Sequence, residues 1–86
     1  MAPGVLSTAT KEVIALAIAA TKGCDGCIAY HARAAAKAGA TRQEVAEALG
    51  VALLMGGGPV SSYGPLALAA FDEFSTPGLE VVADDG

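Results

Sequence analysis

Alanine dominates this chain of 86 residues, and large side chains are correspondingly scarce. Tryptophan is absent, and the aromatic residues are two tyrosines and two phenylalanines. Alanine has the highest helix propensity of all residues, and no segment alternates apolar and polar residues as a half-buried strand would. The composition and the patterning therefore predict an all-α fold.

Capping residues place the first two helices. Ser7 is a suitable N-cap for a first helix that ends near Lys22, because serine accepts a hydrogen bond from the first turn. A second helix is expected to begin near Cys24 or Asp25 and to end by Ala38, with a glycine following each helix. Because the turn between them is short, the two helices are expected to form an antiparallel hairpin.

Two further helices follow. Residues 41–44 read Thr-Arg-Gln-Glu, a capping-box pattern that opens a third helix, and the glycine-proline break at residues 56–59 ends it. A fourth helix ends near Phe74. It begins either at Pro59 or near Pro65, since proline is suited to the first turn of a helix. We therefore expect about four helices.

The chain (residues 1–86) is expected to form one domain, with a helical core at residues 6–74 and an acidic tail at residues 75–86. Hydrophobic residues make up 53% of the sequence, but an alanine-rich core of this size buries little apolar area. The first helix is apolar on every side between Val13 and Ala20, so we expect it to be buried. The excess of apolar surface predicts a homo-oligomer.

Charge and hydropathy limit the partners of the chain. Its net charge is −4 and its isoelectric point is near 4.6. Arg33, Lys37 and Arg42 are interpreted as a solvated face, so no nucleic-acid partner is expected. The first residues lack the basic segment of a secretory signal, and the longest apolar run is too short to cross a bilayer. We therefore expect a cytoplasmic protein with no membrane partner.

Both cysteines and the only histidine lie in one short segment. Cys24, Cys27 and His31 are three and four residues apart, and these spacings return to the same face of a helix. In a reducing cytosol such a cysteine pair is more often catalytic or metal-binding than structural. Both cysteines fall in the first turn of the second helix, where backbone N–H groups favour the reactive thiolate. The segment therefore predicts redox chemistry or a metal site.

Glu12 is the only acid on the expected buried first helix, twelve residues before Cys24. It lies on an apolar face of the first helix, and the antiparallel hairpin would bring it near His31. A carboxylate can orient an imidazole and stabilise its charged form, so that His31 accepts or returns a proton beside Cys27. A peroxide would oxidise one sulfur to a sulfenic acid, and the other sulfur would condense with it to a disulfide.

Other interpretations remain open for these residues. In one, both cysteines, the histidine and Glu12 hold a zinc ion in a non-catalytic or scaffold protein. In another, the cysteines are inert core residues. Tyr30 and Tyr63 are interpreted as packing residues. The glycines at residues 56–58 lack the lysine and hydroxyl residue of a phosphate-binding loop, so no cofactor is predicted.

Taken together, Glu12, the Cys-Asp-Gly-Cys segment at residues 24–27 and His31 resemble the core motif of the alkylhydroperoxidase D-like proteins. These proteins belong to the carboxymuconolactone decarboxylase superfamily. Residues 11–17 and residues 55–59 are also similar to that family, so the resemblance covers nearly the whole chain. It implies an all-α fold that assembles as trimers or hexamers. It also implies a thiol-dependent peroxidase or disulfide reductase activity.

The resemblance implies a role for each residue. Cys27 would be the peroxidatic thiol that a hydroperoxide oxidises, and Cys24, nearer the helix tip, would be the resolving thiol that the reductant attacks. His31 and Glu12 would relay the proton. The reductant would be a dithiol, either a lipoylated protein or a thioredoxin-like protein. Some family members carry a second histidine where Gly26 stands here, so that part of the relay is missing. The decarboxylase branch lacks the cysteine pair, so lactone decarboxylation is not expected.

Overall fold

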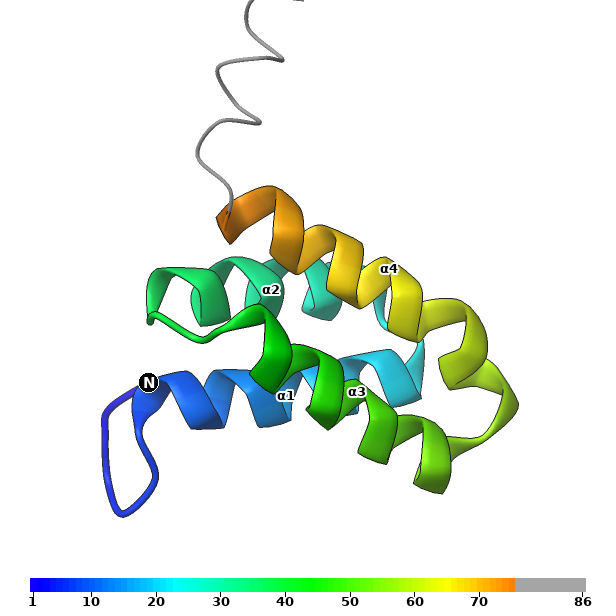
Figure 1. Ribbon diagram of the computed structural model, residues 1–86, viewed down its shortest axis with the longest axis horizontal. Coiled ribbons are helices and arrows are strands. Elements are labelled where there is room, and N and C mark those ends of the chain that lie inside the picture. The colour runs from blue at the N-terminus through cyan, green and yellow to red at the C-terminus, as the bar shows by residue number, and fades with distance from the viewer. Residues whose placement is uncertain (76–86) are drawn as a thin grey trace, which may run out of the picture.

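The computed structural model describes residues 1–75, which form four α-helices and no strand (Figure 1). The helices are α1 (Thr8–Lys22), α2 (Asp25–Lys37), α3 (Arg42–Gly56) and α4 (Gly58–Ser75). The prediction of an all-α fold with about four helices is confirmed. From residue 76 onward, the predicted acidic tail lies outside the described residues. Within residues 1–75, no helix is both long and apolar enough to span a lipid bilayer.

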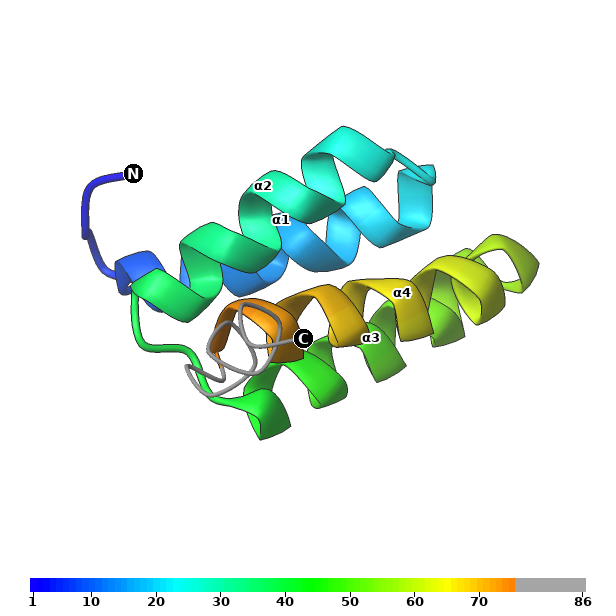
Figure 2. The same ribbon diagram turned by 90° about the horizontal axis from the view of Figure 1, so that it is seen from above.

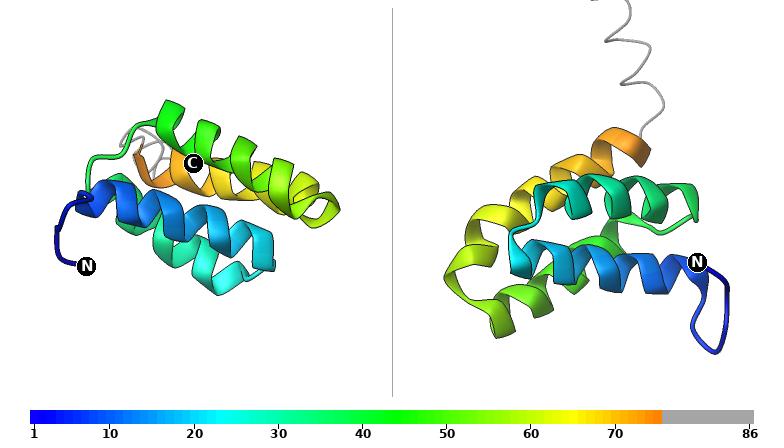
Figure 3. Two further views of the ribbon diagram at one scale, coloured as in Figure 1. Left: turned by 90° about the horizontal axis from the view of Figure 1, so that it is seen from below. Right: turned by 180° about the vertical axis from the view of Figure 1, so that it is seen from behind.

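The helices pack as two antiparallel pairs. The pair α1 and α2 lies along one side of the molecule, and the pair α3 and α4 lies along the other (Figure 2). Contacts of α1 with α3 and α4, and of α2 with α4, join the pairs into one core. The turn between α1 and α2 lies at the same end as the turn between α3 and α4 (Figure 3). This end of the molecule carries both cysteines.

The predicted caps are the residues that begin the helices. The Ser7 hydroxyl accepts a hydrogen bond from the Thr10 N–H at 3.0 Å. At the start of α3, Thr41 Oγ1 accepts from the Glu44 N–H at 3.1 Å, and Glu44 Oε1 accepts from the Thr41 N–H at 2.7 Å. This capping box satisfies two N–H groups that would otherwise lack partners. The bounds of the first three helices are therefore confirmed.

The fourth helix begins at Gly58, one residue before Pro59, the first of the two predicted starts. Pro59 lies in its first turn, where the missing N–H would have had no helical partner. The alternative start near Pro65 is wrong, because this residue lies inside the helix. Helix α4 can follow α3 so closely because of Gly56: a Cβ at this position would lie 2.7 Å from Val60 Cγ2.

The core lies between the two helix pairs. Alanines of α1 and α2 pack against a few large side chains, and the largest fully buried ones are Leu16, Val45, Val60 and Phe71. The small alanine side chains thus allow the helices to approach one another closely, as the composition predicts.

Within the single chain the first helix is not buried on every side, and the prediction that it is fully buried depends on the predicted oligomer. Ile14 is 43% exposed and Ile18 is 51% exposed, because α2, α3 and α4 leave one face of α1 uncovered. These two side chains, with Val51 and Met55 of α3, line an apolar hollow of about 390 Å³. A homo-oligomer would cover such a face, and the predicted oligomer stays a prediction.

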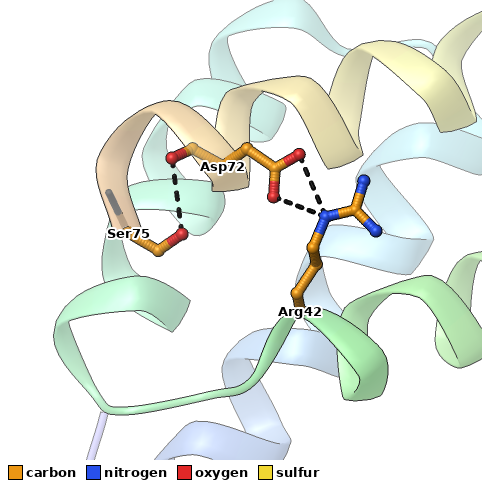
Figure 4. A network of polar contacts seen from close by, with 3 residues as sticks. All are labelled: Arg42, Asp72 and Ser75. Atoms are coloured by element: carbon orange, nitrogen blue, oxygen red, sulfur yellow. Dashed lines mark hydrogen bonds and ion pairs between the residues drawn. The ribbon is translucent and has the colours of Figure 1, made fainter. Parts of the chain in front are cut away.

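An ion pair joins the start of α3 to the end of α4. Arg42 Nε donates to Asp72 Oδ1 at 2.9 Å and to Oδ2 at 3.2 Å (Figure 4). The Asp72 carbonyl also accepts a hydrogen bond from the Ser75 hydroxyl at 3.4 Å. Arg42 is exposed, as predicted, and the ion pair is a contact that the sequence did not predict. Arg33 and Lys37 are exposed, as predicted.

Candidate active site

The turn between α1 and α2 places the cysteine pair. Gly23 ends α1 in the left-handed conformation, with a φ of 65° that favours glycine. The Cys24 N–H donates to the Ala19 carbonyl at 3.1 Å, which holds the turn against the last turn of α1. Cys24 is then the N-cap of α2, and its sulfur is joined to that of Cys27 in a disulfide. The two cysteines therefore face each other at the tip of the hairpin.

The sulfur of Cys24 occupies the position of a helix-capping oxygen. It accepts a hydrogen bond from the Cys27 N–H at 3.2 Å. Backbone N–H groups and the helix dipole favour negative charge at this point. When the disulfide is opened, a thiolate on Cys24 is stabilised by the same N–H group.

Glu12 and His31 form the polar pair that the hairpin was expected to bring together. Glu12 Oε1 lies 2.6 Å from His31 Nδ1, across the contact between α1 and α2. Glu12 is 5% exposed, and among residues 1–75 it is the single buried charged residue. The His31 side chain is 25% exposed. An ionised carboxylate can only accept a hydrogen bond, so Nδ1 then carries the hydrogen. The Nε2 atom is left free to exchange a proton.

Two tyrosines border these residues, and sequence reasoning treated both as packing residues. The Tyr30 ring meets the His31 ring edge to face, with centroids 5.0 Å apart and an interplanar angle of 81°. Tyr63 of α4 lies against Gly23, where a Cβ would be 3.0 Å from the tyrosine Cε2. Adjacency in sequence could have indicated the first contact. The second depends on how α4 packs, for which the sequence carries no signal.

The two cysteines differ in exposure, and the role of Cys24 as the point of attack for the reductant stays a prediction. Cys24, expected to be open to the reductant, is half-buried, whereas Cys27 is exposed. The N-cap position turns the Cys24 sulfur back toward the N–H groups of its own helix. Proximity to the helix tip is therefore a poor guide to accessibility in this hairpin.

The structure does not join every predicted residue directly. Among the hydrogen bonds of residues 1–75, none connects His31 to either sulfur, although His31 follows Cys27 by one helical turn. A proton passing between them would need a bridging water or a rotation of the imidazole.

The zinc alternative lacks a set of ligands. Within the described part of the chain, no group of three or more histidine, cysteine, aspartate or glutamate side chains is placed to hold a metal ion. The two sulfurs are bonded to each other, and the Glu12 carboxylate is directed at His31. This geometry does not support the four-ligand zinc site that the sequence allowed.

Comparison with known proteins assigns the family. Residues 1–73 match the family model described as the carboxymuconolactone decarboxylase family. A crystal structure of an apo carboxymuconolactone decarboxylase family protein from Legionella pneumophila is similar, with a TM-score of 0.83 and 49% identity. The similarity covers 87% of this chain and 67% of that one. The fold is thus that of a solved structure, and this chain belongs to the carboxymuconolactone decarboxylase family.

Two curated relatives are also similar. An uncharacterised protein of Cupriavidus necator is 48% identical over 69 residues, which cover 80% of this chain and 61% of the relative. A protein described as uncharacterised protein 4 in the cox locus of Paracoccus denitrificans is 39% identical over 72 residues, covering 84% and 65%. The chain thus spans less than two thirds of the length of these relatives.

Proposed function

We propose that this chain is a thiol peroxidase and disulfide oxidoreductase that reduces hydroperoxides at the expense of a dithiol. The observation that carries the proposal is the arrangement of two features on one helix pair. A disulfide lies at the capped N-terminus of α2, and His31, paired with Glu12 of α1, follows Cys27 by about one turn of the same helix. Activated thiols and an oriented general base are the components that thiol-based peroxide reduction requires.

The first step oxidises Cys27. Its thiolate attacks the terminal oxygen of the hydroperoxide, the O–O bond breaks, and the sulfur becomes a sulfenic acid. The sulfur loses two electrons, and the peroxide gains them. The alkoxide that leaves takes a proton and departs as an alcohol. His31 Nε2 takes the proton of the Cys27 thiol through a water and returns it to the alkoxide, and the Glu12 carboxylate stabilises the imidazolium in the meantime.

The second step forms the disulfide that the structure contains. The Cys24 thiolate attacks the sulfur of the sulfenic acid, the S–O bond breaks, and hydroxide leaves with a proton as water. A dithiol reductant then opens the disulfide, and both cysteines return to the thiol state. The absence of a second relay histidine, where Gly26 stands, leaves His31 as the single imidazole of the mechanism.

The partners and the setting of the reaction belong to the same proposal. The reductant is a dithiol, either a lipoylated protein or a thioredoxin-like protein, and the oxidant is a small hydroperoxide. The chain works as a homo-oligomer, a trimer or a hexamer, in the cytoplasm. Support for the oligomer comes from the apolar hollow between α1 and α3, in which Ile14, Ile18 and Met55 are exposed.

Trapping the sulfenic acid tests the proposal. In the reduced Cys24→Ser variant, peroxide treatment should leave a sulfenic acid on Cys27 that a dimedone-type probe captures. The Cys27→Ser variant should be labelled far less. Peroxide consumption by the unaltered chain should then continue when dihydrolipoamide or reduced thioredoxin is supplied. If neither variant is labelled and no peroxide is consumed, the proposed function is wrong.

A further inference from the structure

The exposed side of α2 forms a continuous stripe that starts at the disulfide. Cys27, Tyr30, Arg33 and Lys37 are all exposed and follow one another at intervals of three and four residues. Tyr30, Arg33 and Lys37 share one side of the helix, and Cys27 adjoins this side next to Tyr30, one turn nearer the start of α2. At about 1.5 Å per residue, Arg33 lies roughly 9 Å and Lys37 roughly 15 Å along the helix from Cys27. We call these four residues the α2 stripe.

The far part of the α2 stripe is a basic hollow. Tyr30, Arg33, Ala34 and Lys37 line a depression of about 270 Å³, large enough for a carboxylate side chain. The ion pairs within residues 1–75 are Glu12–His31 and Arg42–Asp72, so neither Arg33 nor Lys37 has an acidic partner there. The chain as a whole carries a net charge of −4. Arg33 and Lys37 thus place two cations in one hollow of α2, in a chain that is acidic overall, and this hollow indicates a surface for an acidic group.

We propose that the α2 stripe is the docking surface of the reductant, and that the reductant is a dithiol with acidic side chains near its thiols. This inference rests on the proposed function, since it identifies the partner of the same site. The carboxylates of the reductant contact Arg33 and Lys37, and its first thiolate meets Cys27. Because the overall charge of the chain repels an acidic partner, the local cations orient it so that its thiol meets Cys27, the more exposed cysteine.

The chemistry on this surface reverses the predicted point of attack. The first thiolate of the reductant attacks the Cys27 sulfur, the S–S bond breaks, and Cys24 leaves as a thiolate that the Cys27 N–H stabilises. The second thiol of the reductant loses its proton to solvent. It then attacks the first sulfur of the reductant, which is bonded to Cys27 in the mixed disulfide. Cys27 then leaves as a thiolate. The reductant becomes a disulfide, and two electrons have passed to the cysteine pair.

Three short dithiol peptides test the surface in the oxidised, full-length chain. They share one sequence except at two positions, which are both Glu, both Gln or both Lys. At about 0.01 M ionic strength the Glu peptide should open the disulfide faster than the Gln peptide by about two- to thirtyfold, the range that two exposed ion pairs supply. The Lys peptide should be slowest. The differences should vanish near 1 M salt, where the Debye length is about 3 Å.

Variants separate docking from general attraction. In the double variant Arg33→Gln/Lys37→Gln, the advantage of the Glu peptide should disappear while the rate with the Gln peptide is kept. Lys22→Gln removes a positive charge from the last turn of α1, outside the α2 stripe, and should retain that advantage to within about twofold. An equal loss in the Lys22 variant would overturn the proposal, and so would equal rates for the Glu and Gln peptides.

The position of the mixed disulfide gives a second readout. A peptide with one thiol, quenched rapidly with acid and mapped by mass spectrometry, should be attached mainly to Cys27, and attachment mainly to Cys24 would contradict the mechanism. A second copy of this chain is the competing occupant of the stripe. If a second copy covered the stripe, all three peptides would react equally slowly. The charge-reversed double variant Arg33→Glu/Lys37→Glu would then also sediment differently from the unaltered chain. Together these results would overturn the proposal. These peptide experiments contain no peroxide and measure only the opening of the disulfide. A failure of the proposed peroxide reduction would therefore appear in the sulfenic-acid trapping and not here.

Discussion

Two ion pairs hold helices together in this molecule, and they differ in almost every physical respect. Glu12–His31 joins α1 to α2 at 2.6 Å, with the carboxylate side chain 7% exposed. Arg42–Asp72 joins α3 to α4 at 2.9 Å, with side chains 61% and 35% exposed. The first pair sits beside the disulfide, and the second lies at the end of α4 that is remote from it.

The two pairs differ in the free energy needed to remove their charged groups from water. Removing a carboxylate from water is unfavourable by several kcal/mol, and the attraction of its partner commonly does no more than offset that loss. An exposed pair loses little hydration and contributes about 0–1 kcal/mol. Apolar residues at positions 12 and 31 would serve the core of this alanine-rich fold at least as well. We therefore expect the buried pair to contribute to the proposed chemistry rather than to stability.

The largest expected effect is on catalysis at the buried pair. Glu12→Gln keeps the shape of the side chain but removes the charge that stabilises protonated His31. Oxidation of the reduced thiols by peroxide should slow by roughly ten- to a thousandfold, a general acid–base contribution. The rate is measured by stopped-flow loss of free thiol, and circular dichroism checks that the helices are retained.

The exposed pair supplies the matched control. Asp72→Asn makes the same type of change, a charged carboxylate to its amide, and should alter the oxidation rate by less than about twofold because this pair is remote from the sulfurs. Equal slowing in both variants would mean that the effect is one of net charge. Unchanged rates in both Glu12→Gln and His31→Gln would mean that Glu12 is a structural carboxylate and that no relay exists.

The next effect is on stability. His31→Ala leaves the buried Glu12 carboxylate without its partner, which should lower the free energy of unfolding by about 1–3 kcal/mol. The partial exposure of His31 lets water replace some of the lost contact, so a larger effect is not expected. Urea unfolding followed by circular dichroism measures the difference.

A double variant sharpens this interpretation. Glu12→Leu/His31→Leu replaces both partners with apolar side chains and should recover stability to within about 1 kcal/mol of the original chain, while peroxide reduction is lost. If the double variant is less stable than His31→Ala alone, the pair is needed for folding, and the distinction drawn between the two pairs fails.

Much of the fold could be predicted because its signals are local. Ser7, Gly23 and the capping box at residues 41–44 each act within a few residues, so the chain itself marks the helix bounds. The start of α4 was ambiguous because Pro59 and Pro65 both suit a first turn, and only packing decides between them. Which face of α1 the other three helices leave uncovered also depends on packing.

The candidate site divides in a similar way. The Glu12–His31 contact could be predicted because a hairpin of two helices brings a fixed set of residues together. The order of exposure of Cys24 and Cys27 could not, since it depends on the direction of the N-cap sulfur. The contact of Tyr63 with Gly23 and the pairing of Arg42 with Asp72 both depend on where α4 lies, and residues so distant in sequence share no local pattern.

The smallest effect is expected at the exposed pair, and measuring it completes the comparison. A double-mutant cycle with Arg42→Ala and Asp72→Ala should give a coupling energy of about 0.2–1 kcal/mol, because solvent screens the charges and holding two side chains in one geometry loses entropy. The coupling should shrink at high salt, where the Debye length falls to about 3 Å. The same cycle at Glu12 and His31 should be larger and nearly independent of salt, since water and ions are excluded from one partner. If the two cycles give equal energies with equal dependence on salt, burial does not distinguish the pairs, and stability alone would account for Glu12.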